Sequence, residues 1–439
     1  MDGFILPLLM LVVMLLGILL GYPVAFSLGG AAAIFLLVSD LPASFFNLMA
    51  SRVYANAVSN WLLVCIPRFG FMGLILERSG TAGRALVTLQ KALGRTPAGL
   101  AIAVLLVGVL LAAASGIVGA SVILLGTLAL PQMRAAGYSK PLCAGVICSA
   151  GTLAILIPPS IMLVLFSDLL SVSVGDLFAG AMLPGLILAG AYAILVAIWS
   201  LIFPKAAPPH ELGGVSFYVL MRDTAPLTGL IFCVLGSILT GTATPTEASA
   251  LGAVGAMAIA AFTGTLNRKM LREVALLTIY TTAMVMLVTI GATCFSAVFR
   301  GVGGEEMIIK GLRALQFGPW GELTLLMVVI FILGCFLDWL EISLITLPIF
   351  GPIVAGLDFG LGMSKQQTLL WFAVLVAVNL QTSFLSPPFG FSLFYLRGVA
   401  KDVLSNRDIY IGIVPFIITQ LLVLALFMFY PDPIIWPSK

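Results

Sequence analysis

Long apolar runs separated by short polar stretches make up most of the chain. In the first half, the runs at about 4–20, 23–39 and 53–76 are each long enough for a helix that crosses a bilayer, because about 20 residues cover its ~30 Å hydrocarbon core. Residues 80–95 mix basic and aliphatic side chains, which is typical of a helix lying at the membrane surface. The pattern predicts an all-α polytopic membrane protein.

Two later runs of the first half do not fit simple spanning helices. The run at about 98–130 would form a helix roughly 50 Å long, which is too long for one crossing and too short for two. The polar Ser115–Ser121 stretch at its middle therefore predicts a re-entrant helical hairpin. The run at about 141–170 contains the Pro158-Pro159 pair, and since proline removes a helical hydrogen bond, we expect a broken helix there. A last helix is expected at about 177–203.

The second half repeats the landmarks of the first. A shift of 222 residues places Pro23 on Pro245 and Arg78 on Arg300, and further prolines match in the same order after small insertions. We therefore expect a tandem duplication. Its parts are a first repeat at 1–203, a linker at 204–224, a second repeat at 225–430 and a C-terminal tail at 431–439, with the second hairpin at about 320–357 and the second broken helix at about 368–399.

The positions of Lys and Arg indicate how the repeats are oriented. If both hairpins return to the side that they enter, each repeat crosses the membrane five times, and the repeats are inverted. With the N-terminus outside, fourteen Lys and Arg residues then lie inside and six outside, whereas hairpins that cross give ten on each side; Arg68, within a helix, is left out of both counts. Because basic residues collect on the cytoplasmic side, the sequence favours re-entrant hairpins and a periplasmic N-terminus.

Composition narrows the class of protein. Of the 439 residues, 61% are hydrophobic and 9% are charged, with a net charge of +3. So few charges cannot cover a water-exposed surface, which excludes a soluble enzyme, and neither the basic clusters of a nucleic-acid binder nor the polar composition of a disordered chain is present. The six cysteines lie in apolar stretches and His210 stands alone in a loop, so we expect neither disulfides nor a zinc site.

Each half thus places two interruptions of helical structure at mid-membrane depth. Unwound backbone persists there only where protein, water or a ligand satisfies its polar groups, and inverted-repeat carriers hold ions and substrate at such places. Hydroxyl and carbonyl oxygens suit Na⁺, and helix N-termini suit a carboxylate. The predicted sodium and substrate ligands are Ser115, Gly116, Gly119, Ser121, Thr152, Pro158, Pro159 and Ser160 in the first half, and Asp338, Glu341, Ser343, Thr382, Ser383, Ser386, Pro387 and Pro388 in the second.

Structural interpretations of these residues stay open. A Gly/Ser cluster or a Pro-Pro pair in a membrane helix also serves packing or kinking, and Asp338 and Glu341 can cap a helix at the hairpin turn. Arg68 stands in an apolar helix with no partner nearby in sequence, so it can snorkel, meet a lipid or face an acid across the fold. Glu247 falls in the first turn of an expected helix, where the helix dipole favours an acid.

Several segments, taken in order, resemble the large membrane subunit of a tripartite ATP-independent periplasmic (TRAP) transporter over essentially the whole chain. They are GYPVAF (21–26), LERSG (76–80), SGIVGAS (115–121), IPPS (157–160), SVGDLF (173–178), GTATPTEA (241–248), FLDWLEIS (336–343) and NLQTSFLSPPFGFSLFYL (379–396). The last two also resemble the subgroup labelled for mannitol or chloroaromatic compounds. The chain departs from the family at the first tip, which is commonly richer in Gly and Ser, and at Arg68, where an apolar residue is usual.

This resemblance implies a sodium-driven importer of organic acids in the bacterial cell inner membrane, with coupling sodium ions and no other cofactor. A soluble periplasmic substrate-binding protein would deliver the acid. A separate small four-helix membrane subunit would brace this chain in the membrane lipid while it moves the substrate like an elevator, with sodium sites at the hairpin tips and facing breaks. The alternatives are a stand-alone ion-coupled organic-anion carrier and, more distantly, a membrane-embedded enzyme, although the sequence lacks a catalytic motif for one.

Overall fold

The computed structural model describes residues 4–42, 44–115, 118–210, 214–387 and 390–438. Every regular element in these ranges is a helix, which confirms the all-α prediction. Eight helices of the described part are long and apolar enough to cross a membrane. Shorter apolar helices of 10–17 residues accompany them.

The first half begins with two short apolar helices and a long interrupted element. A surface segment, a helical hairpin, a broken helix and a long final helix follow. The elements are α1 (Ile5–Leu19), α2 (Val24–Val38), α3 (Ser44–Val53), the π turn η2 (Tyr54–Val58), the 3-10 turn η3 (Trp61–Val64), α4 (Cys65–Arg78), α5 (Thr81–Leu93), α6 (Gly99–Ser115), α7 (Val118–Ala135), α8 (Lys140–Thr152), the 3-10 turn η4 (Leu153–Ile155), α9 (Ile161–Leu170), α10 (Val174–Ile202) and the turn η5 (Pro204–Ala206).

The second half repeats this order, with an unbroken third helix. Its elements are α11 (Phe217–Leu239), α12 (Pro245–Phe262), α13 (Arg268–Gly301), α14 (Gly304–Leu315), α15 (Gly318–Gly334), α16 (Trp339–Ala355), α17 (Lys365–Leu385), α18 (Phe391–Ala400), α19 (Asn406–Phe429), α20 (Asp432–Ile435) and the turn η6 (Trp436–Ser438). The hairpins are thus α6–α7 and α15–α16, and the broken helices are α8–α9 and α17–α18.

Packing between the halves is reciprocal. Helix α2 packs on α13 as α12 packs on α4, and α7 packs on α18 as α16 packs on α9. In the order of elements, α2 corresponds to α12, α4 to α13, α7 to α16 and α9 to α18. Exchanging corresponding elements therefore converts the first contact of each pair into the second. This relation is what two copies of one unit, related by a two-fold axis, would give, so it supports the expected duplication.

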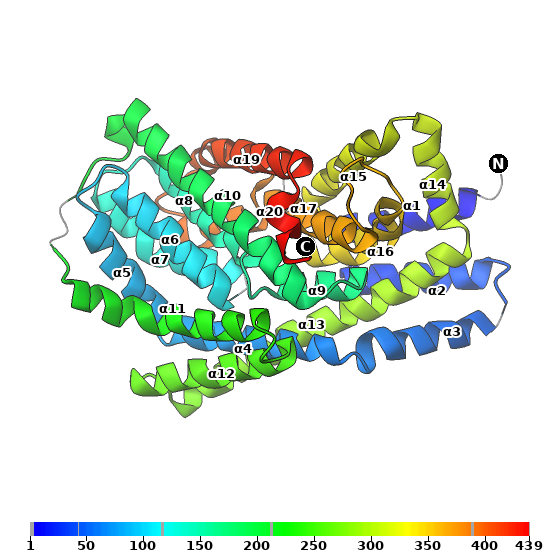
Figure 1. Ribbon diagram of the computed structural model, residues 1–439, viewed down its shortest axis with the longest axis horizontal. Coiled ribbons are helices and arrows are strands. Elements are labelled where there is room, and N and C mark those ends of the chain that lie inside the picture. Colours follow the sequence, from blue (N-terminus) through cyan, green and yellow to red (C-terminus); the bar gives the residue numbers. More distant parts are fainter. Residues whose placement is uncertain (1–3, 43, 116–117, 211–213, 388–389, 439) are drawn as a thin grey trace.

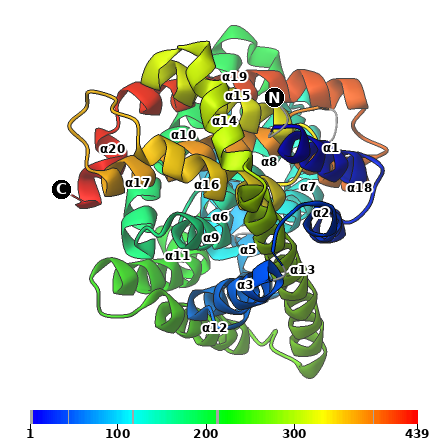
Figure 2. The ribbon, with the colours of Figure 1, turned by 90° about the vertical axis from the view of Figure 1, so that its right-hand side faces the viewer.

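Two layers can be followed in both views of the molecule. Helices α3, α11, α12 and α13 lie on one side, and α15, α17 and α19 lie on the other (Figures 1 and 2). We call α2–α4 with α11–α13 the scaffold layer, and the two hairpins with the two broken helices the hairpin layer. The N-terminus lies at the right end of Figure 1, whereas the linker between α10 and α11 lies at the left end. The halves therefore begin at opposite ends of the long axis, as inverted repeats require.

The broken helices form the core of the hairpin layer. Residues 142–167 and 370–386 are buried without exception. Both segments carry buried polar side chains, among them Ser149, Asn379 and Gln381, and lipid offers such groups no hydrogen-bond partner, which favours a position inside the protein. Trp371 is fully buried and its indole N–H donates to the carbonyl of Phe427 on α19 at 2.8 Å.

The third element of the first half differs from expectation. The sequence pattern predicts one helix at 53–76, but helical structure begins at Ser44 and is interrupted before Cys65. Asn60 gives the reason, because its side-chain oxygen accepts from the N–H of Leu62 at 3.1 Å and its side-chain N–H donates to Asp168 at 2.7 Å. An asparagine that binds nearby backbone competes with the helical ladder.

Two further boundaries differ from the expected ones. Residues 217–224, expected in the linker, form the start of α11, where Asp223 accepts a hydrogen bond at 2.7 Å from Thr88 of α5. The expected tail instead contains the short helix α20, whose Ile434 and Ile435 are buried. Tertiary contacts with α5 and α10 therefore order segments whose local sequence is polar or rich in proline.

Candidate functional site

The first break lies between α8 and α9 and matches the predicted interruption. After Thr152 the chain tightens into η4 and continues through Pro158 and Pro159 before α9 begins. Since proline has no N–H, the α-helical ladder cannot pass through this pair. The whole break is buried, and the Thr152 hydroxyl donates to the carbonyl of Ser149 at 2.9 Å.

The second break lies between α17 and α18. Ser386 follows the last turn of α17 in an extended conformation and is buried, whereas Pro387 is exposed. The N–H of Gly390, just before α18, donates to the carbonyl of Ser386 at 3.0 Å and closes the turn. Gly390 has a φ of +27°, a conformation that favours glycine. Pro388, also a predicted ligand, lies outside the described residues.

A hydroxyl group bridges each break. Ser160 donates back across the first break to the carbonyl of Ile155 at 2.6 Å, and Ser392 donates across the second to the carbonyl of Phe384 at 2.5 Å. Both serines are fully buried. Each bond satisfies a carbonyl near the end of the preceding helix and holds the two helical segments together. The sequence singled out Ser160 but not Ser392.

One face of α17 is polar. Asn379, Thr382, Ser383 and Ser386 follow one another at helical spacing, and each is at most 3% exposed. The side-chain N–H of Asn379 donates to the carbonyl of Met327 on α15 at 2.7 Å, and Thr382 donates to the carbonyl of Asn379 at 2.5 Å. The side-chain oxygens of Asn379, Ser383 and Ser386 find no hydrogen-bond partner among the described residues.

Such unpartnered oxygens need an explanation. A buried polar group without a partner costs about 1–3 kcal/mol, so three on one helix face call for a hydrogen-bonding or coordinating partner such as water or an ion. In the first half, Ser149 and Thr152 repeat the spacing of Asn379 and Thr382, and the Ser149 hydroxyl also lacks a partner among the described residues. Sequence reasoning missed Ser149 and Asn379, although polar residues three apart in an apolar helix were a usable signal.

The second hairpin packs directly on this polar face. A Cβ atom added to Gly334, at the end of α15, would lie 2.3 Å from the Ser383 hydroxyl oxygen. Only glycine permits this approach of the hairpin to α17. The first arm of the second hairpin therefore meets α17 just before the second break, four residues ahead of the predicted tip at Asp338–Ser343.

The two acids of the second tip form a capping box at the start of α16. One carboxylate oxygen of Asp338 accepts from the N–H of Trp339 at 2.8 Å, and the Glu341 carboxylate accepts from the N–H of Asp338 at 3.1 Å. Ser343 is fully buried and donates to the carbonyl of Trp339 at 2.5 Å. These hydrogen bonds are the ones expected if Asp338 and Glu341 cap the helix. Each carboxylate nevertheless keeps further lone pairs that a ligand could use.

The first hairpin contacts both broken helices. Its second arm, α7, packs on η4 and on α18. A Cβ atom at Gly119 would lie 2.8 Å from the ring of Tyr395 on α18, and one at Gly151 on α8 would lie 2.3 Å from a methyl carbon of Val122. Ser121 is buried in this contact region and Ser115 ends α6, while Gly116 lies outside the described residues.

Tyr395 connects the two groups of predicted ligands. Its ring packs on Gly119 of the first hairpin, and its hydroxyl lies near enough to the Asp338 carboxyl group of the second for charges on the two groups to affect each other. Residues of both hairpin tips therefore lie near this one side chain of α18. No sequence signal pointed to Tyr395, because a tyrosine in an apolar run is ordinary.

Arg68 and Glu247 have structural partners away from the breaks. The guanidinium of Arg68 donates to the carbonyl of Thr246 at 2.7 Å and so joins α4 to the first turn of α12. The Glu247 carboxylate accepts from the N–H of Thr244 at 2.8 Å and completes a capping box. For both residues these bonds support the structural interpretation.

A polar cavity of about 260 Å³ separates the scaffold and hairpin layers. Arg52 of α3 and Arg300 of α13 line it from one side, and Leu344 and Pro348 of α16 line it from the other. Asp168, at the end of α9, borders this cavity and a neighbouring one. The hairpin layer thus meets the scaffold across a space that carries two positive side chains.

Comparison with known proteins gives the family of the chain. Residues 11–432 match the model of the "Tripartite ATP-independent periplasmic transporter, DctM component". The chain is 32% identical to the C4-dicarboxylate TRAP transporter large permease protein DctM of Pseudomonas aeruginosa (85% of this chain, 84% of the relative). It is 28% identical to the 2,3-diketo-L-gulonate TRAP transporter large permease protein YiaN of Escherichia coli, with 96% of each chain covered.

A solved structure shows the same fold. The YdaH transporter of Alcanivorax borkumensis superposes with a TM-score of 0.64 at 16% identity, covering 98% of this chain and 99% of the other. Both relatives named above are transporter permeases rather than enzymes. From the family match over nearly its whole length, the chain belongs to the DctM family, the large permease components of tripartite ATP-independent periplasmic transporters.

Proposed function

We propose that this permease imports an organic acid together with sodium ions, after a periplasmic substrate-binding protein has delivered the acid. The family is tripartite, so a small membrane subunit and a binding protein complete the transporter. The observation that supports sodium coupling is the set of three unpartnered oxygens, those of Asn379, Ser383 and Ser386, buried on α17 where the second hairpin packs.

Sodium fits the chemistry of this face. Na⁺ is a hard cation that binds hydroxyl, amide and carbonyl oxygens, which are the groups found here. An ion bound between α17 and the Gly334 end of α15 would supply the missing partners and hold the hairpin closed. Closure would then complete the substrate site, so that sodium and substrate binding favour each other. Of the remaining predicted ligands, Thr152 to Ser160 make up the first break, and Asp338 to Ser343 lie at the start of α16 in the second hairpin.

A carboxylate is the proposed substrate class. The relatives named above transport a C4-dicarboxylate and 2,3-diketo-L-gulonate, both organic acids. The cavity between the layers carries Arg52 and Arg300. Arg300 already donates to the Pro348 carbonyl at 2.6 Å and pairs with Glu305 at 3.7 Å, so the Arg52 guanidinium is the group that suits an entering carboxylate. Movement of the hairpin layer against the scaffold layer would carry the bound acid across, in the manner of an elevator.

We also propose that the chain lies in the bacterial inner membrane with a periplasmic N-terminus. The N-terminus and the linker lie at opposite ends of the long axis, and the basic residues of the linker and of α5 belong to the linker end (Figure 1). Basic residues favour the cytoplasmic side, which supports this orientation.

Uptake into proteoliposomes tests the proposal. The permease and its small subunit are reconstituted, and uptake of a panel of labelled C4-dicarboxylates and sugar acids is measured with the partner binding protein and an inward sodium gradient. Uptake should fall to background when potassium replaces sodium. Equal uptake in both salts would reject sodium coupling, and full uptake without the binding protein would favour a stand-alone carrier.

A further inference from the structure

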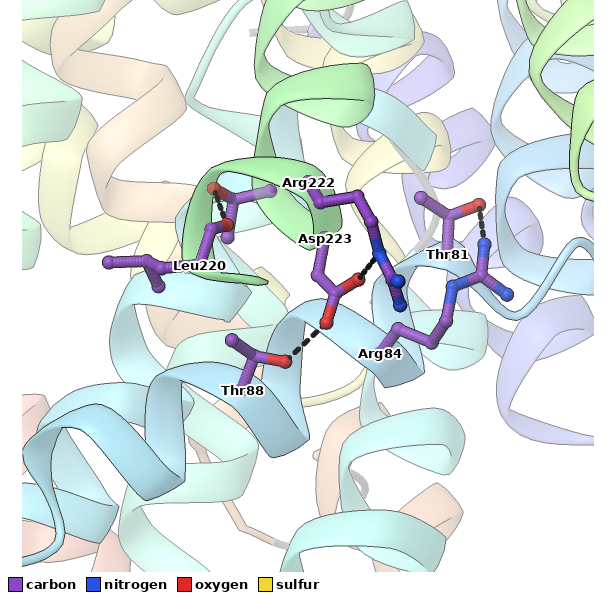
Figure 3. Close-up of polar contacts among 7 residues, drawn as sticks. Thr81, Arg84, Thr88, Leu220, Arg222 and Asp223 are labelled. Carbon is purple, nitrogen blue, oxygen red and sulfur yellow. Dashed lines mark hydrogen bonds and ion pairs between the residues drawn. The ribbon is translucent and has the colours of Figure 1, made fainter. Parts of the chain in front are cut away.

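A cavity of about 740 Å³, whose lining includes none of the residues of the breaks, lies between α5, α7 and the start of α11. Two basic side chains of α5, Arg84 and Lys91, line it, while Leu124 and Leu128 of α7 and Val219 of α11 form an apolar wall. Figure 3 shows part of this region, with Arg84 on α5 beside the start of α11. The lining of the cavity is therefore positively charged on one side and apolar on the other.

The one acid at the cavity is already neutralised. Asp223 is 8% exposed, accepts a hydrogen bond from the Thr88 hydroxyl at 2.7 Å and pairs with Arg222 at 3.3 Å (Figure 3). Arg84 donates to the Thr81 hydroxyl at 3.2 Å. Neither Arg84 nor Lys91 forms an ion pair within the described part of the chain. Arg84 and Lys91 thus face the cavity as two positive charges that no acidic side chain of the described residues pairs with.

The geometry separates a head region from a tail region. Arg84 and Lys91 are two helical turns apart on one face of α5, a rise of about 10 Å, which leaves room for one phosphate group between their side chains. The apolar wall faces this pair from α7 and α11. A molecule with an anionic head and a hydrocarbon tail matches both sides of the cavity, whereas a small free anion would leave the apolar wall unused.

We propose that this cavity binds an anionic phospholipid, with its phosphate at Arg84 and Lys91 and an acyl chain along Leu124, Leu128 and Val219. The cavity belongs to the linker end of the molecule, which the distribution of basic residues assigns to the cytoplasmic leaflet. A second cavity, between α1 and α14–α16, has an almost entirely aliphatic lining, and no basic residue stands among its described lining residues.

The site joins two parts of the molecule. Helix α7 is an arm of the first hairpin, whereas α5 and α11 pack on each other outside the hairpin. A lipid seated here would contact both, so its occupancy is expected to affect how the hairpin sits against α5.

Native mass spectrometry of the purified, delipidated protein tests the proposal. Phosphatidylglycerol and phosphatidylethanolamine of equal chain length are added back in separate titrations. Phosphatidylglycerol should bind more tightly, and R84Q/K91Q should weaken its binding about tenfold or more. The matched control R268Q/R272Q removes two exposed basic residues at the start of α13 and should change binding less than about twofold.

Further experiments distinguish a bound phospholipid from a free anion and from a protein partner. L124W fills the apolar wall without changing charge and should also weaken phosphatidylglycerol binding, with a monodisperse elution profile showing that the variant is folded. Equal binding of both lipids, or of R84Q/K91Q and the unchanged protein, would overturn the proposal. Displacement of the lipid by millimolar inorganic phosphate would assign a free-anion site instead. Loss of the small subunit rather than of the lipid from R84Q/K91Q would assign a protein-docking surface.

Discussion

At the scale of single residues, the hydroxyls of Ser383 and Ser386 distinguish an ion site from a packing site. A buried hydroxyl without a partner lowers stability, so its removal should raise the free energy of unfolding by about 1 kcal/mol. We therefore expect Ser383→Ala to keep or raise the unfolding temperature while it abolishes sodium-stimulated uptake. Thermal unfolding and uptake against sodium concentration measure the two effects.

A control for this variant is Ser200→Ala, since that buried hydroxyl donates to the carbonyl of Ala197 at 2.7 Å, far from the breaks. It should leave sodium dependence intact. If Ser383→Ala loses stability and keeps its sodium dependence, the hydroxyl has a packing role only.

Arg68 is expected to be a structural residue. Its bond to the Thr246 carbonyl joins α4 to α12, and a hydrogen bond from a charged donor contributes about 1.5–3 kcal/mol. Arg68→Met should lower the unfolding temperature and leave the sodium affinity of uptake unchanged. Arg78→Met is the matched control, because its pair with Glu273 is about half exposed and contributes less than about 1 kcal/mol. A shifted sodium affinity in Arg68→Met would contradict this assignment.

The predicted ligands could be found from the sequence only in part. Ser383, Ser386 and Ser160 stand beside prolines that break a helix, and this local signal is readable. Tyr395 and Gly334 became visible only with the fold, because their importance comes from what a distant hairpin or helix places against them. The local sequence indicates where a helix is interrupted, but it does not indicate which distant residue packs against the interruption.

At the scale of elements, the second hairpin depends on the close approach of Gly334 to Ser383. Gly334→Ala places a methyl group 2.3 Å from the hydroxyl oxygen, and overpacking of this kind costs about 1–3 kcal/mol. We expect the hairpin to be displaced from α17 and uptake to fall by about 5- to 150-fold, the loss to which this energy corresponds. Initial uptake rates at saturating sodium measure the change.

Two comparisons sharpen this prediction. Gly311→Ala, in α14, meets no neighbouring atom within 4 Å and should transport normally. Adding Ser383→Gly to Gly334→Ala removes the clash and should restore the unfolding temperature but not the sodium response. Normal uptake by Gly334→Ala alone would show that the hairpin need not pack on α17.

The elements were largely predictable because length and proline position determine them. A run of about 33 apolar residues with a polar centre has few solutions in a bilayer, and the hairpin α6–α7 is one of them. The interruption of α3–α4 was not predictable in the same way, because Asn60 acts by binding Asp168, which lies 108 residues further along the chain. Such long-range side-chain contacts leave no periodic pattern.

At the scale of the whole molecule, the elevator proposal requires the hairpin layer to move against the scaffold layer. Ser296 of α13 and Leu344 of α16 line the same cavity from the two layers. In a background where Cys233, Cys294 and Cys335 are replaced, S296C/L344C treated with a reversible thiol cross-linker should lose uptake and regain it after reduction. The single variants should be unaffected. Full uptake by the cross-linked pair would argue against movement between these layers.

The exchange of packing partners between the halves also bears on how the protein is made. Since α2 rests on α13 and α4 on α12, the scaffold helices of the first half gain their partners within the scaffold layer only after the second half has been translated, although α2 already contacts α1 and α4 already contacts α6. The scaffold layer as defined here is therefore completed only when synthesis has passed α13. Biogenesis ends with one late assembly step, and any factor that shields helices during translocon release would act in that interval.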